Sequence, residues 1–268
     1  MEGTVYSAPR ISKSVRKRGT YGRKPSLGWT CAVRLKAEEG TGSVESEYLS
    51  ANVGEITLGN GNWPVDRAIE DCLETMHVNE ESAFRVRISD DSDLNIDISL
   101  ESCIERSYVF EWSDREKLDM SKIYKADGVN LFKSGRIDQA FYKFSKALKM
   151  LLLITSDVDS FEILSEESDL LVSLYNNLAS CQFHFGNYTY VIELCSRSLG
   201  VNPNVKGYFR RALAYIELKE YENAQDDLLA LLKIEPKNKA AIEKYKLVRE
   251  LDKTNRENYE EIVKNMFR

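Results

Sequence analysis

The sequence of 268 residues has no run of eighteen apolar residues, only two histidines and no closely spaced pair of cysteines. Because a membrane-spanning helix needs a long apolar run, we expect none, and the basic start of the chain lacks the apolar stretch of a secretory signal. His77 and His184 lie far apart in sequence, so a zinc site or a Ser-His-Asp triad has little to be built from. We expect neither a metal nor a cofactor.

The five cysteines follow no CxxC or CxH spacing, and their number is odd. They are Cys31, Cys72, Cys103, Cys181 and Cys195. Disulfide frameworks are typical of small secreted chains with an even number of cysteines. We therefore predict buried free thiols in a reducing compartment, which indicates the cytoplasm, with the nucleus as an alternative.

Charge is unevenly distributed along the chain. The net charge is −6, but residues 1–25 hold seven Lys or Arg against one Glu, a net of +6, so the remainder is −12. With Pro9, Pro25 and little apolar content, this segment predicts a flexible basic tail over residues 1–27. Such a tail could contact nucleic acid, a membrane surface or the acidic body of the chain. Since no base-reading motif accompanies it, a solvated tail is the simplest interpretation.

Residues 28–112 have the pattern of a small domain built on strands. Short apolar runs with alternating character occur at "WTCAVRLKA", "AFRVRI", "ISL" and "YVFEW", separated by glycines and acidic clusters. Val65, Ile69, Leu73 and Met76 recur at four, four and three residues, which is the period of one helical face. We predict an antiparallel sheet with one helix lying on it.

From Glu111 onward the apolar period becomes helical, and "SDRE" at Ser113–Glu116 is a capping-box pattern that opens the first helix. Six positions then recur at the same offsets in three units. They are Gly128, Phe132, Gly135, Ala140, Phe144 and Ala147; Ala179, Phe183, Gly186, Val191, Cys195 and Ser198; and Ala212, Ile216, Lys219, Ala224, Leu228 and Leu231. Small residues open each series, where two helices are expected to cross closely. This is the pattern of the tetratricopeptide repeat (TPR), a helix pair of about 34 residues.

Residues 113–268 are therefore predicted to form an all-α array of three TPR units, at about 121–154, 172–204 and 205–238. Pro203 and Pro236 end units two and three. A further helix from Asn238 to about Met266 is expected to cover the apolar side of the third unit. The whole chain is accordingly predicted to belong to the α+β class.

Four polar residues are expected on the concave face of this array, which the first helix of each unit lines. Lys206 and Arg210 are one helical turn apart in unit three, and the corresponding positions are Asn177 in unit two and Lys125 in unit one. Two cations of unit three, the amide of unit two and the lysine of unit one would converge on one groove. That arrangement suits a peptide that ends in paired carboxylates, held by charge-assisted hydrogen bonds.

These residues resemble the dicarboxylate clamp of TPR co-chaperones, which bind the Met-Glu-Glu-Val-Asp tail of heat-shock protein 90. Four of the five clamp positions match: Lys125, Asn177, Lys206 and Arg210. The fifth, usually Asn one turn after the lysine, is Val129 here. Arg211 lies beside the clamp in sequence and is expected to point elsewhere.

The arrangement of a small sheet and one helix before three TPR units resembles the FKBP-type immunophilins. "ITLGNG" at Ile56–Gly61 is similar to the F-x-L-G-x-G of that family, and "LETMHVNE" is similar to its V-x-x-M-x-x-G-E. The aromatic pocket of the prolyl isomerases is not matched. No Phe-Asp pair occurs between Ala37 and Glu55, and the position of the tryptophan at the pocket floor is Ile69. The resemblance therefore implies an FKBP-like domain, at residues 28–112, without isomerase activity or macrolide binding.

These resemblances together imply a non-catalytic adaptor or co-chaperone. The TPR groove would bind the acidic C-terminal tail of heat-shock protein 90, and the FKBP-like half would bind a client. The chain is also similar to an insect member of the family whose isomerase half lacks the aromatic pocket. That similarity implies that the client is the Doubletime kinase, of casein kinase I type, and that the protein has a circadian role. Two alternatives remain open: an active isomerase with a diverged pocket, and a scaffold whose groove accepts a segment of a second copy.

Overall fold

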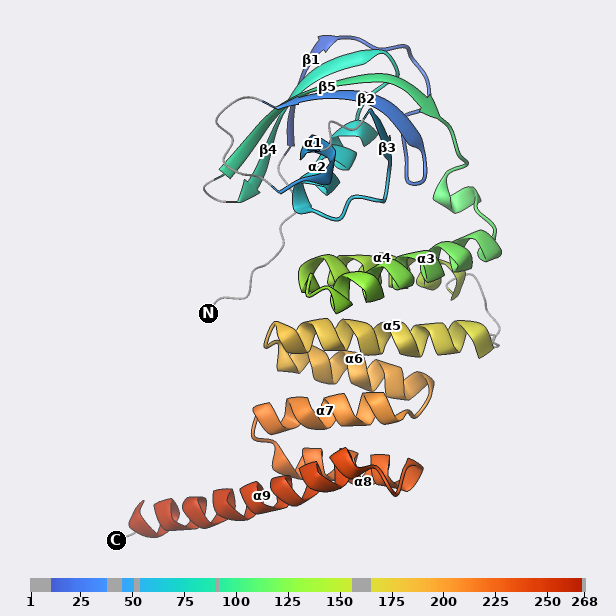
Figure 1. The fold of residues 1–268 in the computed structure, drawn as a ribbon. Helices are drawn as coiled ribbons and strands as arrows, with labels where there is room; N and C mark the ends of the chain where they lie inside the picture. The colour runs from blue at the N-terminus through green and yellow to red at the C-terminus, as the bar shows by residue number, and fades with distance from the viewer. Residues whose placement is uncertain (1–10, 38–44, 51–53, 90–91, 156–164, 267–268) are drawn as a thin grey trace. The chain divides into compact units, whose positions relative to one another are not determined.

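The computed structural model describes residues 11–37, 45–50, 54–89, 92–155 and 165–266. The chain divides into two compact units, Met1–Trp112 and Ser113–Arg268, which Figure 1 shows as a sheet domain and a stack of helices. The predicted α+β class is confirmed.

The first unit is built on an antiparallel sheet with the strand order β1-β4-β5-β2-β3. Its strands are β1 (Ile11–Lys17), β2 (Thr30–Ala37), β3 (Glu55–Thr57), β4 (Glu80–Ser89) and β5 (Ser92–Ile104), and its helices are α1 (Glu47–Ser50), α2 (Pro64–Glu74) and the 3-10 turn η1 (Val109–Glu111). Alternate residues of β5, such as Leu94 and Ile96, are buried and share one core with α2. The sheet curves over that helix in Figure 1.

The predicted helical face of α2 is confirmed, because Val65, Ile69, Leu73 and Met76 are all buried. The sequence "YVFEW", expected to be a strand, instead contains η1. The Tyr108 amide donates to the Glu111 carboxylate at 3.0 Å. This local hydrogen bond satisfies the backbone N–H of Tyr108, which in a strand would need a partner on a neighbouring strand.

The predicted flexible tail over residues 1–27 is wrong for residues 11–17, which form strand β1. Strand β1 pairs with β4, with Ile11 opposite Val86. Its cations form exposed ion pairs with carboxylates of β4 and β5: Arg16 lies 2.6 Å from Asp97, and Lys17 lies 3.3 Å from Glu81. The basic residues of this segment, which the sequence suggests are a solvated tail, are therefore part of the sheet. Residues 1–10 lie outside the described residues.

The second unit consists of helices stacked in sequence order (Figure 1). They are α3 (Asp114–Lys133), α4 (Ile137–Thr155), α5 (Ser165–His184), α6 (Tyr188–Val201), α7 (Val205–Glu217), α8 (Tyr221–Ile234) and α9 (Lys239–Met266). The expected capping box opens α3, since Ser113 and Glu116 each accept the other's backbone N–H. Helices α3 to α8 form three pairs, as the TPR pattern predicts.

The turn inside each helix pair has the same left-handed backbone. Gly135, Gly186 and Lys219 occupy one repeat position and have φ angles of 79°, 74° and 63°. Glycine adopts this conformation without strain, so Lys219 keeps the turn of its repeat although its side chain disfavours it. The repeat register predicted from sequence is therefore the register of the structure.

Helices α3 and α4 cross closely at Gly128. A Cβ atom at this position would lie 2.6 Å from the ring of Phe144, which is itself buried. The small residue expected at the start of each repeat series is required here by contact with the partner helix.

Helix α9 covers the last repeat, as expected. Its Ala241 and Val248 are fully buried and pack with Ala224, Leu228 and Leu231 of α8. None of the described helices is both long enough and apolar enough to cross a membrane.

Candidate functional site

The predicted clamp residues lie on the first helices of the three repeats: Lys125 on α3, Asn177 on α5, and Lys206 and Arg210 on α7. Lys206 is exposed and the other three are half-buried. Burial and the positive charge of Lys206 both lower the pKa of Lys125, so these two ammonium groups share one electrostatic environment. In the described chain, no carboxylate lies within ion-pair distance of any of the three cations.

Arg210 is the most deeply placed of these cations. Burial lowers the pKa of its guanidinium group, and its Nη1 donates to Asn176 Oδ1 at a long 3.4 Å. Since a guanidinium carries five N–H donors, most of its hydrogen-bonding capacity is unused by the described residues. A desolvated cation in this position would be stabilised by an anionic ligand.

Asn176 is a site residue that sequence reasoning missed. It is buried, and its Nδ2 donates to Val172 O and Ser198 Oγ, both at 2.9 Å. It also contacts Asn204, whose side chain caps the start of α7 by accepting from the Gly207 amide at 2.7 Å. This network fixes the N-terminus of α7 and therefore positions Arg210. The only sequence signal is the adjacent pair of asparagines, and the side chain of the second, Asn177, has no hydrogen-bond partner among the described residues.

Arg211 points away from the clamp, as expected. Its guanidinium makes two hydrogen bonds to Asp227 on α8, at 2.8 and 2.6 Å, and a third to Ser196 on α6 at 2.8 Å. It therefore joins α7 to both α8 and α6.

Val129, at the fifth clamp position, is half-buried on α3 one turn after Lys125. A valine side chain has no hydrogen-bond donor or acceptor. The five clamp positions accordingly supply three cations and one amide.

In the first unit, Ile69 is fully buried on α2. The polar residues beside it bind the segment that contains α1. Tyr48 Oη donates to Glu70 Oε1 at 2.8 Å, and the Gly61 amide donates to the same oxygen at 2.6 Å. Ser46 donates a hydrogen bond to Asp66. Tyr48 is only 8% exposed, so α1 lies against α2.

Two tryptophans of this unit lie at other positions. Trp29 is fully buried and stacks on Tyr108 at 5.9 Å between ring centroids. Trp63 precedes the first residue of α2 at its N-cap, six residues before Ile69. Neither tryptophan takes the place of Ile69 on the helix.

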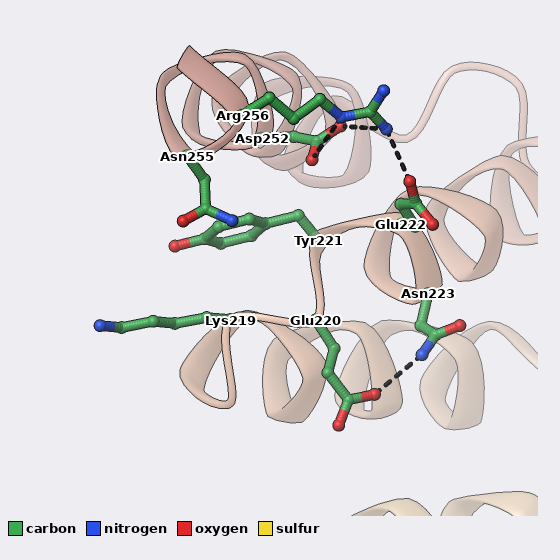
Figure 2. A pocket seen from close by; sticks show the side chains of 8 residues that line it. All are labelled: Lys219, Glu220, Tyr221, Glu222, Asn223, Asp252, Asn255 and Arg256. Carbon is green, nitrogen blue, oxygen red and sulfur yellow. Dashed lines mark hydrogen bonds and ion pairs between the residues drawn. The ribbon is translucent and has the colours of Figure 1, made fainter. Parts of the chain in front are cut away.

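Figure 2 shows a recess between the α7–α8 turn and α9. Its lining residues are Lys219, Glu220, Tyr221, Glu222, Asn223, Asp252, Asn255 and Arg256. Arg256 bridges Glu222 at 2.6 Å and Asp252 at 3.2 Å, and Asn223 donates to Glu220 at 2.8 Å. The Arg256–Glu222 pair ties α9 to α8, so the recess is a junction between these two helices.

Comparison with known proteins agrees with both halves of this description. The family model described as "BDBT FKBP like N-terminal" matches residues 7–105, and a tetratricopeptide repeat model matches residues 205–238. The chain thus has an FKBP-like N-terminal domain followed by TPR repeats, and it is homologous to the TPR-containing FKBP proteins.

Particular relatives include mouse "Peptidyl-prolyl cis-trans isomerase FKBP4", 27% identical over 86% of this chain and 52% of the relative. Human "FK506-binding protein-like" is 30% identical over 82% of this chain and 60% of the relative. The chain thus spans little more than half the length of these relatives.

Two solved structures share the fold. The C-terminal TPR-containing domain of a Plasmodium falciparum FK506-binding protein aligns with a TM-score of 0.51 and 25% identity, over 56% of this chain and 99% of that one. A crystal structure of residues 1–211 of CG17282 aligns with a TM-score of 0.56 and 22% identity, over 68% of this chain and 93% of that one.

Proposed function

We propose that the protein is a co-chaperone adaptor whose TPR groove binds an acidic C-terminal peptide such as that of heat-shock protein 90. One observation carries the proposal. The three cations Lys125, Lys206 and Arg210 lie on the first helices of the repeats, and among the described residues none has a carboxylate partner. A peptide with a terminal carboxylate and a neighbouring acidic side chain supplies the missing charge.

The chemistry of recognition follows from the donors present. Lys206 and Arg210, on adjacent turns of α7, donate charge-assisted hydrogen bonds to one carboxylate. Lys125 supplies a further ammonium group, and the Asn177 amide can donate to the peptide backbone. Asn176 and Asn204 hold α7 in place, so Arg210 is positioned before the peptide arrives.

We further propose that the FKBP-like domain is not a prolyl isomerase, although relatives carry that name. Isomerases of this family hold a prolyl amide in a hydrophobic pocket floored by tryptophan. By the sequence resemblance Ile69 stands at that position, and Tyr48, Gly61 and Ser46 donate hydrogen bonds to Asp66 and Glu70 of the same helix. A peptide isomerisation assay tests this: turnover of a Xaa-Pro peptide above the uncatalysed rate would contradict it.

The FKBP-like half is proposed to bind the client protein. The combination of an immunophilin-like TPR half and an isomerase half without its aromatic pocket resembles the insect protein Bride of Doubletime, and this resemblance suggests the Doubletime kinase, of casein kinase I type, and a role in circadian regulation. Cytoplasmic or nuclear location stays a prediction. A pull-down from lysate with wild-type and Arg210→Ala protein, read by mass spectrometry, distinguishes clients of the two halves.

The groove is tested by calorimetric titration with a Met-Glu-Glu-Val-Asp peptide. Lys206→Ala and Arg210→Ala should each weaken binding about tenfold or more, because a charged hydrogen bond contributes roughly 1.5–3 kcal/mol. Lys237→Ala, which changes an exposed lysine between α8 and α9, should leave affinity unchanged. Circular dichroism checks the fold of each variant. Absence of wild-type binding at high micromolar peptide would contradict the proposal, and sedimentation would then test a scaffold that binds a second copy.

A further inference from the structure

Two cysteines that lie 72 residues apart in sequence meet on neighbouring strands of the sheet. Cys31 on β2 is directly opposite Cys103 on β5, and their Sγ atoms are 3.4 Å apart. In the described chain no such sulfur contact occurs for the remaining cysteines, which are all buried.

The backbone geometry is close to that of a disulfide. Directly opposed Cβ atoms in an antiparallel pair lie about 4.5–5.5 Å apart, and a disulfide needs about 3.5–4.5 Å with an S–S bond of about 2.05 Å. The two sulfurs therefore have to approach by roughly 1.4 Å from their 3.4 Å separation. The pairing of β2 and β5 shifts register immediately after, between Ala32 and Val33, and such irregularities allow local bending.

The two thiols differ in access and in acidity. Cys31 is fully buried, whereas Cys103 is half-buried. The hydrogen-bond contact between the two sulfurs lowers the pKa of Cys103, against the opposing effect of burial, while the same contact and burial both raise the pKa of Cys31. Since the thiolate is the reactive form, Cys103 is the group that meets an oxidant first and Cys31 is the thiol placed to resolve the product.

We propose that Cys31 and Cys103 form a reversible oxidation site whose oxidant is a peroxide. The Cys103 thiolate attacks one peroxide oxygen, the O–O bond breaks, and Cys103 becomes a sulfenic acid as hydroxide leaves. The sulfur of Cys31 then attacks the sulfur of Cys103, and the S–O bond breaks. The hydroxyl group leaves with the proton of Cys31 as water. In total, two thiols and one hydrogen peroxide give one disulfide and two waters, and a dithiol reductant reverses the change by exchange.

The test uses the full-length protein, reduced and then exposed to stoichiometric hydrogen peroxide. Remaining thiols are alkylated, and peptides are mapped by mass spectrometry. We expect a Cys31–Cys103 linked peptide that disappears on treatment with dithiothreitol. The Cys72→Ala variant, which removes a buried thiol of the same domain, should form the same link to the same extent.

The Cys103→Ser variant distinguishes oxidation at this site from general oxidation of cysteines. In that variant Cys31 should stay fully alkylatable under denaturing conditions after peroxide, because no sulfenic acid forms beside it. Three results in wild type would overturn the proposal: Cys103 oxidised to sulfinic acid with Cys31 still a thiol, a link that involves another cysteine, or a disulfide between two chains. The wild-type map decides the question even if a variant fails to fold.

Discussion

Arg211 and Asp227 form a bidentate ion pair that joins α7 to α8, with N–O distances of 2.8 and 2.6 Å. The Asp227 side chain is only 6% exposed and that of Arg211 21%. Removing the arginine would leave a buried carboxylate without its counter-ion. Because breaking such a pair is strongly unfavourable, this residue next to the clamp stabilises the fold.

Arg211→Ala should therefore reduce the free energy of unfolding by about 2–4 kcal/mol, somewhat less than a fully buried pair because the arginine is partly exposed. Urea denaturation followed by circular dichroism measures the change. The control is Lys253→Ala, which breaks an exposed pair with Glu257 and should change stability by less than about 0.5 kcal/mol. Equal effects of the two substitutions would show that the Arg211 pair has no special role.

Val129→Asn should strengthen peptide binding, because it supplies the amide that the fifth clamp position lacks. One added neutral hydrogen bond contributes about 0.5–1.5 kcal/mol, or roughly twofold to tenfold in affinity. Calorimetry with the Met-Glu-Glu-Val-Asp peptide measures the gain. Val129→Ala shortens the side chain without adding a donor and should not improve binding, so a gain in both variants would assign the effect to space and not to the amide.

Stability of the first unit should fall in acid because of Glu80. Burial alone would raise the pKa of this carboxyl group, but hydrogen bonds from Lys13, Ser82 and the His77 amide lower it below its usual range. A folded pKa below the unfolded value of about 4.3 means that the stabilisation is complete above that pH and is lost as pH falls through the folded pKa.

The measurement is urea denaturation of wild type and Lys13→Met between pH 7 and pH 3. The variant removes the ammonium group that lies 2.6 Å from Glu80, so its loss of stability in acid should be smaller than that of wild type. Parallel curves for the two proteins would contradict the assignment to this pair.

Gly128→Ala should destabilise the second unit by about 1–3 kcal/mol, as overpacking of a core does, because the new methyl group would meet the Phe144 ring at 2.6 Å. Gly200 provides a matched control. It lies in α6, and a Cβ atom added to it would have nothing within 4 Å, so Gly200→Ala should be neutral or stabilising by up to about 1 kcal/mol. Thermal unfolding followed at 222 nm, a standard wavelength for helix content, compares the two.

The TPR half could be predicted closely from sequence because its determinants are local. Apolar residues recur within each helix, and the left-handed turn of Gly135 recurs at Gly186. Even Lys219, which breaks the glycine pattern, falls in the same turn because the flanking helices fix it. The positions of Lys125 and Arg210 on first helices followed from this register.

The sheet half was less predictable because strand pairing is not local. Nothing within residues 11–17 indicates that Ile11 lies opposite Val86, and charge on β1 hides its alternating pattern. The contact of Cys31 with Cys103 depends in the same way on the alignment of β2 with β5. Asn176 could not be distinguished from Asn177 until the start of α7 was placed.

Strand β1 also bears on how the protein avoids self-association through its sheet. In the part of the chain that the structure describes, β1 and β3 form the two edges, and an edge strand offers free backbone groups to any other strand. Strand β3 is only three residues long, so it offers little. Strand β1 is seven residues long but carries Lys13, Arg16 and Lys17, and charged side chains disfavour the approach of a second strand. The basic segment therefore protects the sheet against aggregation as well as completing it.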